Sequence, residues 1–390
     1  MKVISGLEVL ADDGAPIKGR RWGLLANHAA VTSALEPARS ALLQSCGPPE
    51  VLFAPEHGLE GIAQDMESVG DTQDPLTGLP ILSLYGDDAT SLKPSPDDLR
   101  DLEAVVVDVP DIGSRYYTFA ASMDGLMAVC QDVGTEVVVL DRPNPLGGLR
   151  REGGLVRPGF ESFVSQLPTP IRHGLTLGEI ALLLQRERYP RLELTVVPCR
   201  GWRRGQLYDE TGLPWVPPSP NMPTLDTALI YPGLCLIEAT TLSEGRGTTR
   251  PFHLVGAPWI EARSLVEHLR TLNLPGIGFR ATWFRPEFQK HAHEVCAGVE
   301  LHILDREVLE PLALGLHLIK TIHDLHPEDF AWRPEPYEFV GDVPALDLLT
   351  GSAEAREIIE TGGEVAPLLS RWRQEVADFN RSLEGVLLYR

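Results

Sequence analysis

Polar and charged side chains directly follow short apolar segments in the first half of this 390-residue chain. The apolar residues 51–54 run into Glu56 and His57, and the segment 104–108 runs into Asp111. A carboxyl group held in a tight loop can give or take a proton, and a neighbouring imidazole can orient it. These residue types therefore predict acid/base chemistry, with Glu56, His57 and Asp111 as candidate catalytic residues.

Side chains that suit a polar ligand accompany these carboxyl groups. Arg115 can clamp a carboxylate or hydroxyl groups, and Tyr116 can stack on a ligand or donate a hydrogen bond. Asn144, close after Asp141, is a good partner for a sugar hydroxyl or an amide, and His173 directly precedes a predicted helix whose N-terminus can bind an anion. We interpret all five residues as candidate ligand-binding residues.

A structural interpretation stands beside each of these candidates. Glu56 also fits a hydrogen-bonded loop acid, and Asp111 with Arg115 also fits an internal ion pair. For Glu179 the structural interpretation is the stronger one, because Thr176 three residues earlier completes a capping-box pattern at the start of a helix.

A second group of candidates lies in and after a proline-rich segment at 213–223, which fits neither a helix nor a central strand. These candidates are Ser219, Asn221, Glu238, Glu244 and Arg246. The chain contains neither a Gly-rich nucleotide-binding motif nor H-E-x-x-H, so a dinucleotide or zinc-protease interpretation lacks its sequence motif, and the absence of G-x-S-x-G weakens a serine-hydrolase interpretation.

The candidate loops need a sheet that brings them to one edge. Strand-like and helix-like segments alternate as far as about residue 200, which is typical of a doubly wound, mostly parallel α/β sheet. In such a sheet, ligands bind outside the carboxyl ends of the strands. We predict a Rossmann-like domain over residues 1–250 and a smaller α+β domain over 251–390. In the second domain we expect helices at 261–272, 306–323, 353–360 and 364–382.

The composition narrows the range of functions. A net charge of −21 argues against binding nucleic acid or anionic membranes through bulk charge. No apolar run has the length of a membrane span, and the first residues do not resemble a signal peptide, so we expect a cytoplasmic protein. The five cysteines are widely spaced and lack a C-x-x-C pair, which predicts buried free thiols.

Carboxyl groups that flank a polar ligand are the usual equipment for glycoside hydrolysis. One carboxylic acid donates a proton to the leaving oxygen, and the other acts as nucleophile, base or charge stabiliser. Their separation, which decides the stereochemistry, does not follow from the sequence.

At these residues the chain resembles a bacterial family, the NamZ-type exo-β-N-acetylmuramidases, long described as a domain of unknown function. The resemblance covers essentially the whole chain. The stretches that carry it are PEHG at 55–58, DIGSRYYT at 111–118, DRPNP at 141–145, RHG at 172–174, LPWVPPSPNMPT at 213–224, LSEGRGTTRPF at 242–252 and GAPW at 256–259.

The resemblance implies a Rossmann-like catalytic domain and a smaller C-terminal domain with the active cleft between them. It implies removal of N-acetylmuramic acid from the non-reducing ends of peptidoglycan-derived saccharides such as MurNAc–GlcNAc, as in cell-wall recycling, with no metal or nucleotide. It makes Glu56 the leading acid/base residue, with Glu244 and then Asp111 as its partner. Many relatives carry an export signal.

The resemblance also suggests how the sugar is held. Arg115 and Arg246 become candidates for the lactyl carboxylate of muramic acid, and Asn144 and Asn221 for hydroxyl or acetamido groups. Two other functions remain open. A non-catalytic sugar-binding module needs the same crevice without the acid, and a metal-dependent hydrolase would use His57, Asp108 and Asp111.

Overall fold

The protein forms two compact units. A computed structural model describes residues 2–334 and 336–390. Unit 1 comprises residues 1–150, 173–223 and 381–390, and unit 2 comprises residues 151–172 and 224–380. The sequence led us to expect a single division at residue 250. The division by contacts falls at 223/224, because the helix that follows this point packs against a helix of the C-terminal part.

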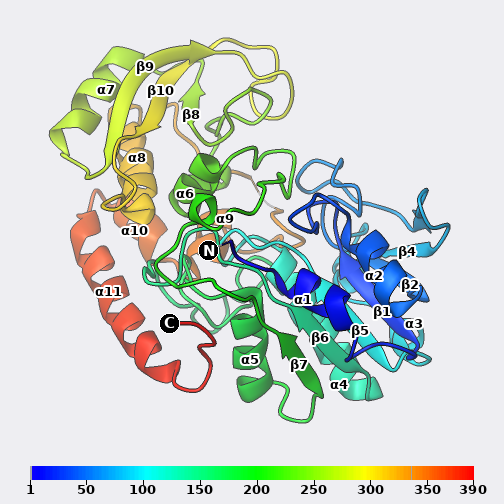
Figure 1. Ribbon diagram of the computed structural model, residues 1–390. Helices are drawn as coiled ribbons and strands as arrows, with labels where there is room; N and C mark the ends of the chain where they lie inside the picture. The colour runs from blue at the N-terminus through cyan, green and yellow to red at the C-terminus, as the bar shows by residue number, and fades with distance from the viewer. Residues whose placement is uncertain (1, 335) are drawn as a thin grey trace. The chain divides into compact units, whose positions relative to one another are not determined.

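Unit 1 is built on a mostly parallel sheet (Figure 1). Its strands are β1 (Trp22–Ala26), β2 (Val51–Ala54), β3 (Thr72–Gln73), β4 (Pro80–Ser83), β5 (Ala104–Asp108), β6 (Glu136–Leu140) and β7 (Leu194–Val197). Among the described residues these seven strands have the order β3-β4-β2-β1-β5-β6-β7. Every neighbouring pair is parallel except β3 with β4. The predicted α/β class is therefore confirmed.

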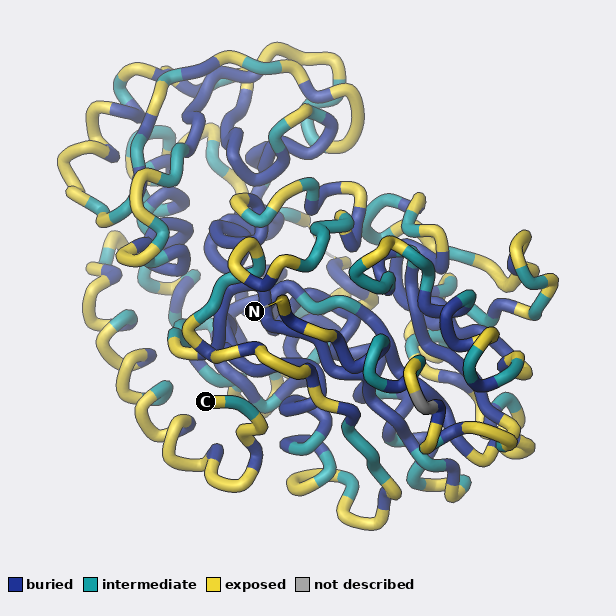
Figure 2. Tube along the Cα trace, viewed as in Figure 1, coloured by how far each residue is buried: buried dark blue, intermediate teal, exposed yellow. Residues whose placement is uncertain are grey.

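Helices cover both faces of this sheet. They are α1 (Gly6–Asp13), α2 (Ala38–Cys46), α3 (Pro96–Leu99), α4 (Phe119–Val133) and α5 (Leu177–Glu187), with the short 3₁₀ helices η1 (Ala89–Leu92) and η2 (Tyr208–Glu210). Leu24, Leu52 and Val106, which are register partners on adjacent strands, form one core with Leu7 and Leu10 of α1. The alternate strand residues are equally buried, as a sheet covered on both faces requires (Figure 2).

The strand order creates a switch point in unit 1. The chain runs outward from β1 to β2 and β4, and then returns to place β5 on the other side of β1. Connections that leave in opposite directions open a crevice at the carboxyl ends of the two strands where the order reverses. The loops that follow β1, β5 and their neighbours β2 and β6 are therefore the ones that can form a ligand site.

Local sequence signals set several helix boundaries. Thr176 caps α5, its hydroxyl accepting from the Glu179 N–H while the Glu179 carboxylate accepts from the Thr176 N–H, which confirms the predicted capping box. The helix expected at 306–323 begins five residues later, at Pro311. A proline fits the first helical position, because its missing N–H would have no partner there in any case.

Unit 2 is an α+β unit, as predicted. In its described residues a three-stranded antiparallel sheet has the order β8-β10-β9, with β8 (Leu254–Ala257), β9 (Ile277–Phe284) and β10 (Cys296–Ile303). Its helices are α6 (Leu225–Leu234), η3 (Cys235–Ala239), α7 (Ala262–Thr271), α8 (Pro311–Leu325), α9 (Ala345–Thr350), α10 (Glu354–Glu360) and α11 (Val365–Ser382). Helix α7 packs on β9 and β10, and α6 packs on α8.

The five cysteines are buried free thiols, as the sequence predicted. Burial raises the pKa of the Cys130 thiol to about 12 and that of Cys296 to about 11. Because the thiolate is the reactive form of cysteine, neither of these two thiols is a nucleophile near neutral pH.

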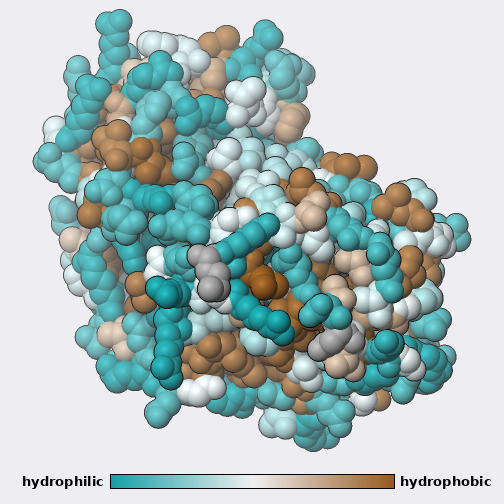
Figure 3. All heavy atoms as spheres, in the orientation of Figure 1, coloured by the Kyte–Doolittle hydropathy of each residue, from teal (hydrophilic) through white to brown (hydrophobic). Residues whose placement is uncertain are grey.

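The visible surface is mostly hydrophilic, with scattered hydrophobic side chains (Figure 3). Within residues 2–334 and 336–390, no helix combines the length and the apolar character that a bilayer crossing requires.

Candidate active site

Glu56 is held at both of its carboxylate oxygens. It lies in the loop after β2 and is 5% exposed. Its Oε2 accepts a hydrogen bond from the Thr118 hydroxyl at 2.6 Å, and its Oε1 accepts one from the Met66 N–H at 3.2 Å. Thr118 lies between β5 and α4, so the loops of two strands meet at this carboxyl group. A catalytic carboxyl group needs this kind of fixed orientation.

The turn after Glu56 is strained. His57 has a φ of +71° and Gly58 one of +76°, so two consecutive residues adopt the left-handed conformation that a side chain disfavours. The buried imidazole of His57 places Nδ1 at 2.9 Å from the Ala63 carbonyl. Because a carbonyl only accepts, Nδ1 is the donor in this contact, which fixes the orientation of the ring. Strain of this kind concentrates at functional sites.

Asp111 has one engaged and one unengaged carboxylate oxygen. Its side chain is 5% exposed. Oδ2 accepts from the Gly113 N–H at 2.6 Å, and His173 Nε2 lies 3.2 Å from the same oxygen. His173 is oriented by the Leu175 N–H, which donates to Nδ1 at 3.1 Å. Oδ1 is buried and has no hydrogen-bond partner among the described residues.

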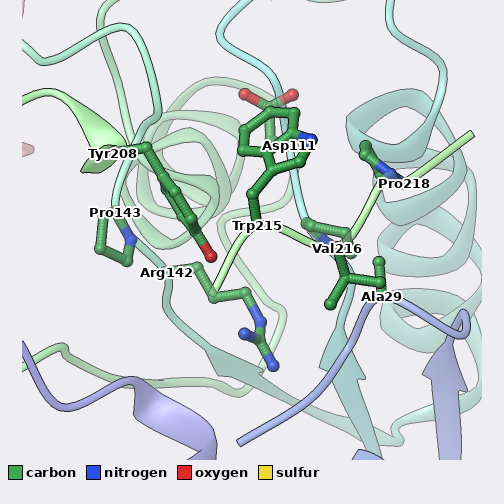
Figure 4. Close-up of a pocket in the computed structure, with 9 residues that line it drawn as sticks. Ala29, Asp111, Arg142, Pro143, Tyr208, Trp215, Val216 and Pro218 are labelled. Atoms are coloured by element: carbon green, nitrogen blue, oxygen red, sulfur yellow. The ribbon is translucent and has the colours of Figure 1, made fainter. Parts of the chain in front are cut away.

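Asp111 lines a pocket in unit 1 that contains about 380 Å³ of empty space, including its open mouth. Figure 4 shows Arg142, Tyr208 and Trp215 around the same pocket. Ala29 follows β1, Asp111 follows β5 and Arg142 follows β6. The pocket therefore lies at the carboxyl ends of the strands at the switch point, where an α/β sheet binds its ligand.

The proline-rich segment forms one side of this pocket. The rings of Tyr208 and Trp215 lie 5.3 Å apart and nearly perpendicular, at 87°, and the Tyr208 hydroxyl donates to the Pro214 carbonyl at 3.0 Å. Pro218 also lines the pocket, and its carbonyl accepts from the Asn27 side-chain amide at 2.9 Å. Side chains thus anchor a segment that has no regular backbone hydrogen bonds.

The end of the same segment approaches the Glu56 loop. The side-chain amide of Asn221 donates to Oε1 of Gln64 at 2.9 Å, and Gln64 lies two residues before Met66, whose N–H binds Glu56. Ser219 is buried close by in the chain. Asn221 therefore braces the loop that holds the carboxyl group.

Arg142 forms a two-point ion pair with Asp108. Its Nε and Nη2 donate to the two carboxylate oxygens at 2.6 and 2.8 Å, and its Nη1 donates to the Val31 carbonyl at 3.1 Å. Burial opposes the charge of Arg142, but the attraction of Asp108 outweighs it and raises the arginine pKa. Asp108, which the metal-dependent interpretation used, thus holds a guanidinium. In the described residues no three His, Cys, Asp or Glu side chains are grouped so as to hold a metal ion.

Asp141 has the contacts of a structural carboxylate. It is fully buried and accepts hydrogen bonds from the Gly178 N–H at 2.8 Å, from the Thr176 hydroxyl at 2.7 Å and from the Tyr389 hydroxyl. Burial is the main reason why the pKa of Asp141 rises from 3.8 to about 6. These contacts join the start of α5 to the C-terminal residues of unit 1, and they favour a structural role over the predicted binding role.

Three other predicted binding residues of unit 1 are also buried. Asn144 accepts from the Leu146 N–H at 2.9 Å and donates to the Leu175 carbonyl at 2.8 Å, so its amide joins two loops. Arg115 is fully buried and Tyr116 nearly so. Both residues lie in the β5–α4 loop, between Asp111 and Thr118.

The second group of candidates forms one cluster in unit 2. Arg246 Nη2 donates to Oε1 of Glu238 at 2.6 Å, and the Tyr337 hydroxyl donates to the other oxygen at 2.9 Å. Glu244, which is 2% exposed, has Lys290 Nζ at 2.9 Å and Arg246 Nε at 3.3 Å. Two cations thus balance two buried carboxylates. This environment suits Glu244 to act as a fixed negative charge.

The structure therefore brings the sequence-predicted residues together in two groups. Glu56, His57, Asp111, His173 and Asn221 belong to the strand-end loops and the proline-rich wall of unit 1, whereas Glu238, Glu244 and Arg246 belong to unit 2. Sequence reasoning missed the partners that hold these residues and the aromatic side chains of the pocket. The partners are Thr118, Lys290 and Tyr337, and the aromatic side chains are Tyr208 and Trp215. Thr118 and Trp215 stand inside stretches already singled out, while the other three carried no local signal.

A fixed, buried carboxyl group at the ligand-binding edge of a parallel sheet, with further buried carboxylates, is typical of an enzyme that works by acid/base catalysis. The comparison with known families defines the class further. The N-terminal domain of the exo-β-N-acetylmuramidase NamZ matches residues 22–226, and its C-terminal domain matches residues 229–389. The chain belongs to the NamZ family of glycoside hydrolases.

Similar proteins support this membership. The chain is 40% identical over 393 aligned positions to the peptidoglycan β-N-acetylmuramidase NamZ of Bacillus subtilis (strain 168), with 100% of this chain and 92% of that protein covered. Two crystal structures of DUF1343 family proteins from Bacteroides fragilis NCTC 9343 are also similar. One is 34% identical with a TM-score of 0.89, the other 29% identical with a TM-score of 0.77, and each match covers 100% of this chain and 99% of the other.

Proposed function

We propose that this protein is an exo-β-N-acetylmuramidase, with Glu56 as its acid/base residue. It would release N-acetylmuramic acid from the non-reducing ends of peptidoglycan fragments. Membership of the NamZ family supports the reaction, and a Bacillus subtilis relative carries the name of a peptidoglycan β-N-acetylmuramidase. The observation that carries the role of Glu56 is its burial at the carboxyl end of β2 with both oxygens held.

The contacts of Glu56 suit proton transfer. Cleavage of a glycosidic bond needs a proton on the leaving oxygen and stabilisation of positive charge on the sugar ring. A hydroxyl group both donates and accepts, so Thr118 can stay hydrogen-bonded to Glu56 before and after the proton leaves. The Met66 N–H fixes the other oxygen meanwhile. Glu56 can therefore change its protonation state without losing its orientation.

For the second carboxylate we propose Glu244 first and Asp111 second. The two cations against Glu244 support a role as a fixed negative charge. As ligands of the lactyl carboxylate we propose Arg246 and Arg115. His57 remains a further catalytic candidate. The further binding candidates are Tyr116, Asp141, Asn144, His173, Ser219, Asn221 and Glu238, and the contacts described above favour structural roles for Asp141 and Asn144.

Two substrates with different leaving groups test the role of Glu56. We would measure sugar release from MurNAc–GlcNAc and from para-nitrophenyl N-acetylmuramide with wild type and Glu56→Gln. A general acid matters most for a sugar alcohol, so the variant should lose on the order of 10²–10⁴-fold in kcat on the disaccharide and less on the nitrophenyl substrate. Glu60→Gln is a matched control, because Glu60 lies in the same loop but is far more exposed.

The other outcomes decide between the remaining functions. Equal activity of wild type and Glu56→Gln would remove Glu56 from the mechanism. Tight disaccharide binding without any release would support a non-catalytic sugar-binding protein. Activity that disappears on exhaustive chelation and returns with added metal would support a metal-dependent hydrolase.

A further inference from the structure

We propose that the pocket beside Asp111 is the subsite for the uncharged leaving sugar, the N-acetylglucosamine unit of MurNAc–GlcNAc. In this subsite Trp215 is the stacking platform and Asp111 is the hydrogen-bond acceptor. The inference rests on the proposed function and adds to it the residues that recognise the leaving group.

The pocket shares its walls with the loops that hold Glu56. Asp111 lines the pocket near the start of the β5–α4 loop, and Thr118, which binds Glu56, ends the same loop. Trp215 lines the pocket near the start of the proline-rich segment, and Asn221 braces the Glu56 loop near its end. Two separate segments thus connect the pocket to the acid/base residue, as expected of neighbouring subsites.

Asp111 offers an unused acceptor to a ligand. Its carboxylate is almost completely buried, and Oδ1 has no hydrogen-bond partner among the described residues. A buried acceptor left without a partner destabilises the protein, so a ligand that supplies a donor gains from satisfying it. A sugar hydroxyl or an acetamido N–H is such a donor. An additional carboxylate is not, because it only accepts.

The charges of the pocket select an uncharged sugar. The cation that lines it, Arg142, is held by both carboxylate oxygens of Asp108, which cancel its charge. Asp111 lines the same pocket, and His173 contacts only its Oδ2. Muramic acid carries a lactyl carboxylate that this environment repels, whereas N-acetylglucosamine carries no charge. The pocket therefore fits the leaving sugar better than the muramyl sugar.

Trp215 supplies the apolar surface and a donor. Its ring lines the pocket and is held perpendicular to that of Tyr208 (Figure 4). Its indole N–H has no partner in the described part of the chain. An unused donor on Trp215 and an unused acceptor on Asp111 match the C=O and N–H of an acetamido group. Aromatic rings with one polar group suit ligands that are apolar on one face and polar at the edge.

Comparing a ligand that has the leaving sugar with one that lacks it tests this subsite apart from the rest of the active site. Trp215→Leu should raise KM for MurNAc–GlcNAc about 10-fold or more, because the lost stacking and hydrogen bond exceed 1.4 kcal/mol. Its inhibition constant for N-acetylmuramic acid, which has no leaving group to place in the subsite, should stay within about twofold of the wild-type value. Trp283→Leu is the matched control, since Trp283 is an exposed residue of unit 2.

Asp111→Asn tests the acceptor with little change in shape. The Gly113 N–H needs an acceptor at 2.6 Å, so the amide must place its oxygen there and its NH₂ group at the position of Oδ1. This turns the pocket's acceptor into a donor. We expect KM for the disaccharide to rise about 10-fold.

A binding measurement keeps this test separate from turnover. In the Glu56→Gln background, calorimetric titration with MurNAc–GlcNAc should show about 10-fold weaker binding after Trp215→Leu or Asp111→Asn, and titration with N-acetylmuramic acid should show no change. Equal losses of affinity for MurNAc–GlcNAc and for N-acetylmuramic acid, or no loss for either, would overturn the subsite. If the proposed function is wrong, the wild type will release no sugar. The calorimetric titrations still test the subsite in that case, because they measure binding and not turnover.

Discussion

Thr118 donates its hydroxyl hydrogen to Oε2 of Glu56 at 2.6 Å, although 62 positions separate the two residues in the sequence. Glu56 follows β2 and Thr118 follows β5, and β1 lies between these strands in the sheet. The hydrogen bond therefore spans the switch point of unit 1. It links the orientation of the proposed acid/base residue to the position where α4 begins.

Removal of the Thr118 hydroxyl should impair catalysis more than folding. Thr118→Val keeps the size of the side chain but leaves Oε2 of Glu56 without its partner. Because a misplaced catalytic group is costly, we expect kcat on MurNAc–GlcNAc to fall on the order of 10- to 100-fold. Thr118→Ser retains the hydroxyl and should keep most of the activity. If the valine variant had wild-type kcat, Thr118 would have no part in positioning Glu56.

Asp141 should make the stability of the protein depend on pH. Burial raises its pKa from 3.8 to about 6, so between these values the folded protein holds a proton that the unfolded chain releases. The stability that this proton contributes is complete below about pH 4 and is lost as the pH rises through about 6. Asp141→Asn keeps an acceptor for the Gly178 N–H and does not titrate.

We therefore expect the free energy of unfolding of the wild type to fall by roughly 1–3 kcal/mol relative to Asp141→Asn between pH 4 and 7.5. Urea titrations of both proteins across this range measure the difference. Stability curves that run parallel from pH 4 to pH 7.5 would show that Asp141 titrates alike in the folded and unfolded states.

Gly113→Ala should destabilise the loop that carries Asp111. Gly113 has a φ of +82°, and an added Cβ would lie 2.7 Å from Oδ1 of Asn144 and 2.9 Å from Cγ of Leu146. Gly134→Ala is the matched control, because its φ is +79° but its Cβ would meet nothing within 4 Å. The control should cost about 1 kcal/mol, and Gly113→Ala about 1–3 kcal/mol more, in chemical unfolding. Equal losses would mean that the neighbouring side chains move aside freely.

Lys290 should stabilise unit 2 through Glu244. Lys290→Met would leave this buried carboxylate with Arg246 as its remaining cation, at a cost of roughly 1–3 kcal/mol. The double variant with Glu244→Gln should recover part of this loss, which a double-mutant cycle measures. Lys320→Met, which removes one of the two partners of the exposed Asp324, should cost no more than about 1 kcal/mol. Similar losses for the two lysine variants would contradict a special role for Lys290.

The sequence predicted the α/β class because apolar segments of strand length alternate with helical ones, and each segment carries that signal locally. The same local logic predicted Thr176 as the cap of α5, since its capping-box partner is three residues away. It also found the carboxyl groups after β2 and β5. The domain boundary at residue 250 stays a prediction; by contacts, residues 224–250 group with unit 2.

By itself the sequence determined which residues stand at the ends of the strands and which stretches match the NamZ family. Only the tertiary structure decided their partners. It placed the Thr118 hydroxyl against Glu56 and left one oxygen of Asp111 without a hydrogen-bond partner among the described residues. It also brought Tyr389 to Asp141, 248 positions away in the sequence. Such pairs follow from the order of strands in the sheet and the path of the closing segments. Local periodicity does not encode that order, because the same segments fit several arrangements until side chains from distant parts of the chain pack together.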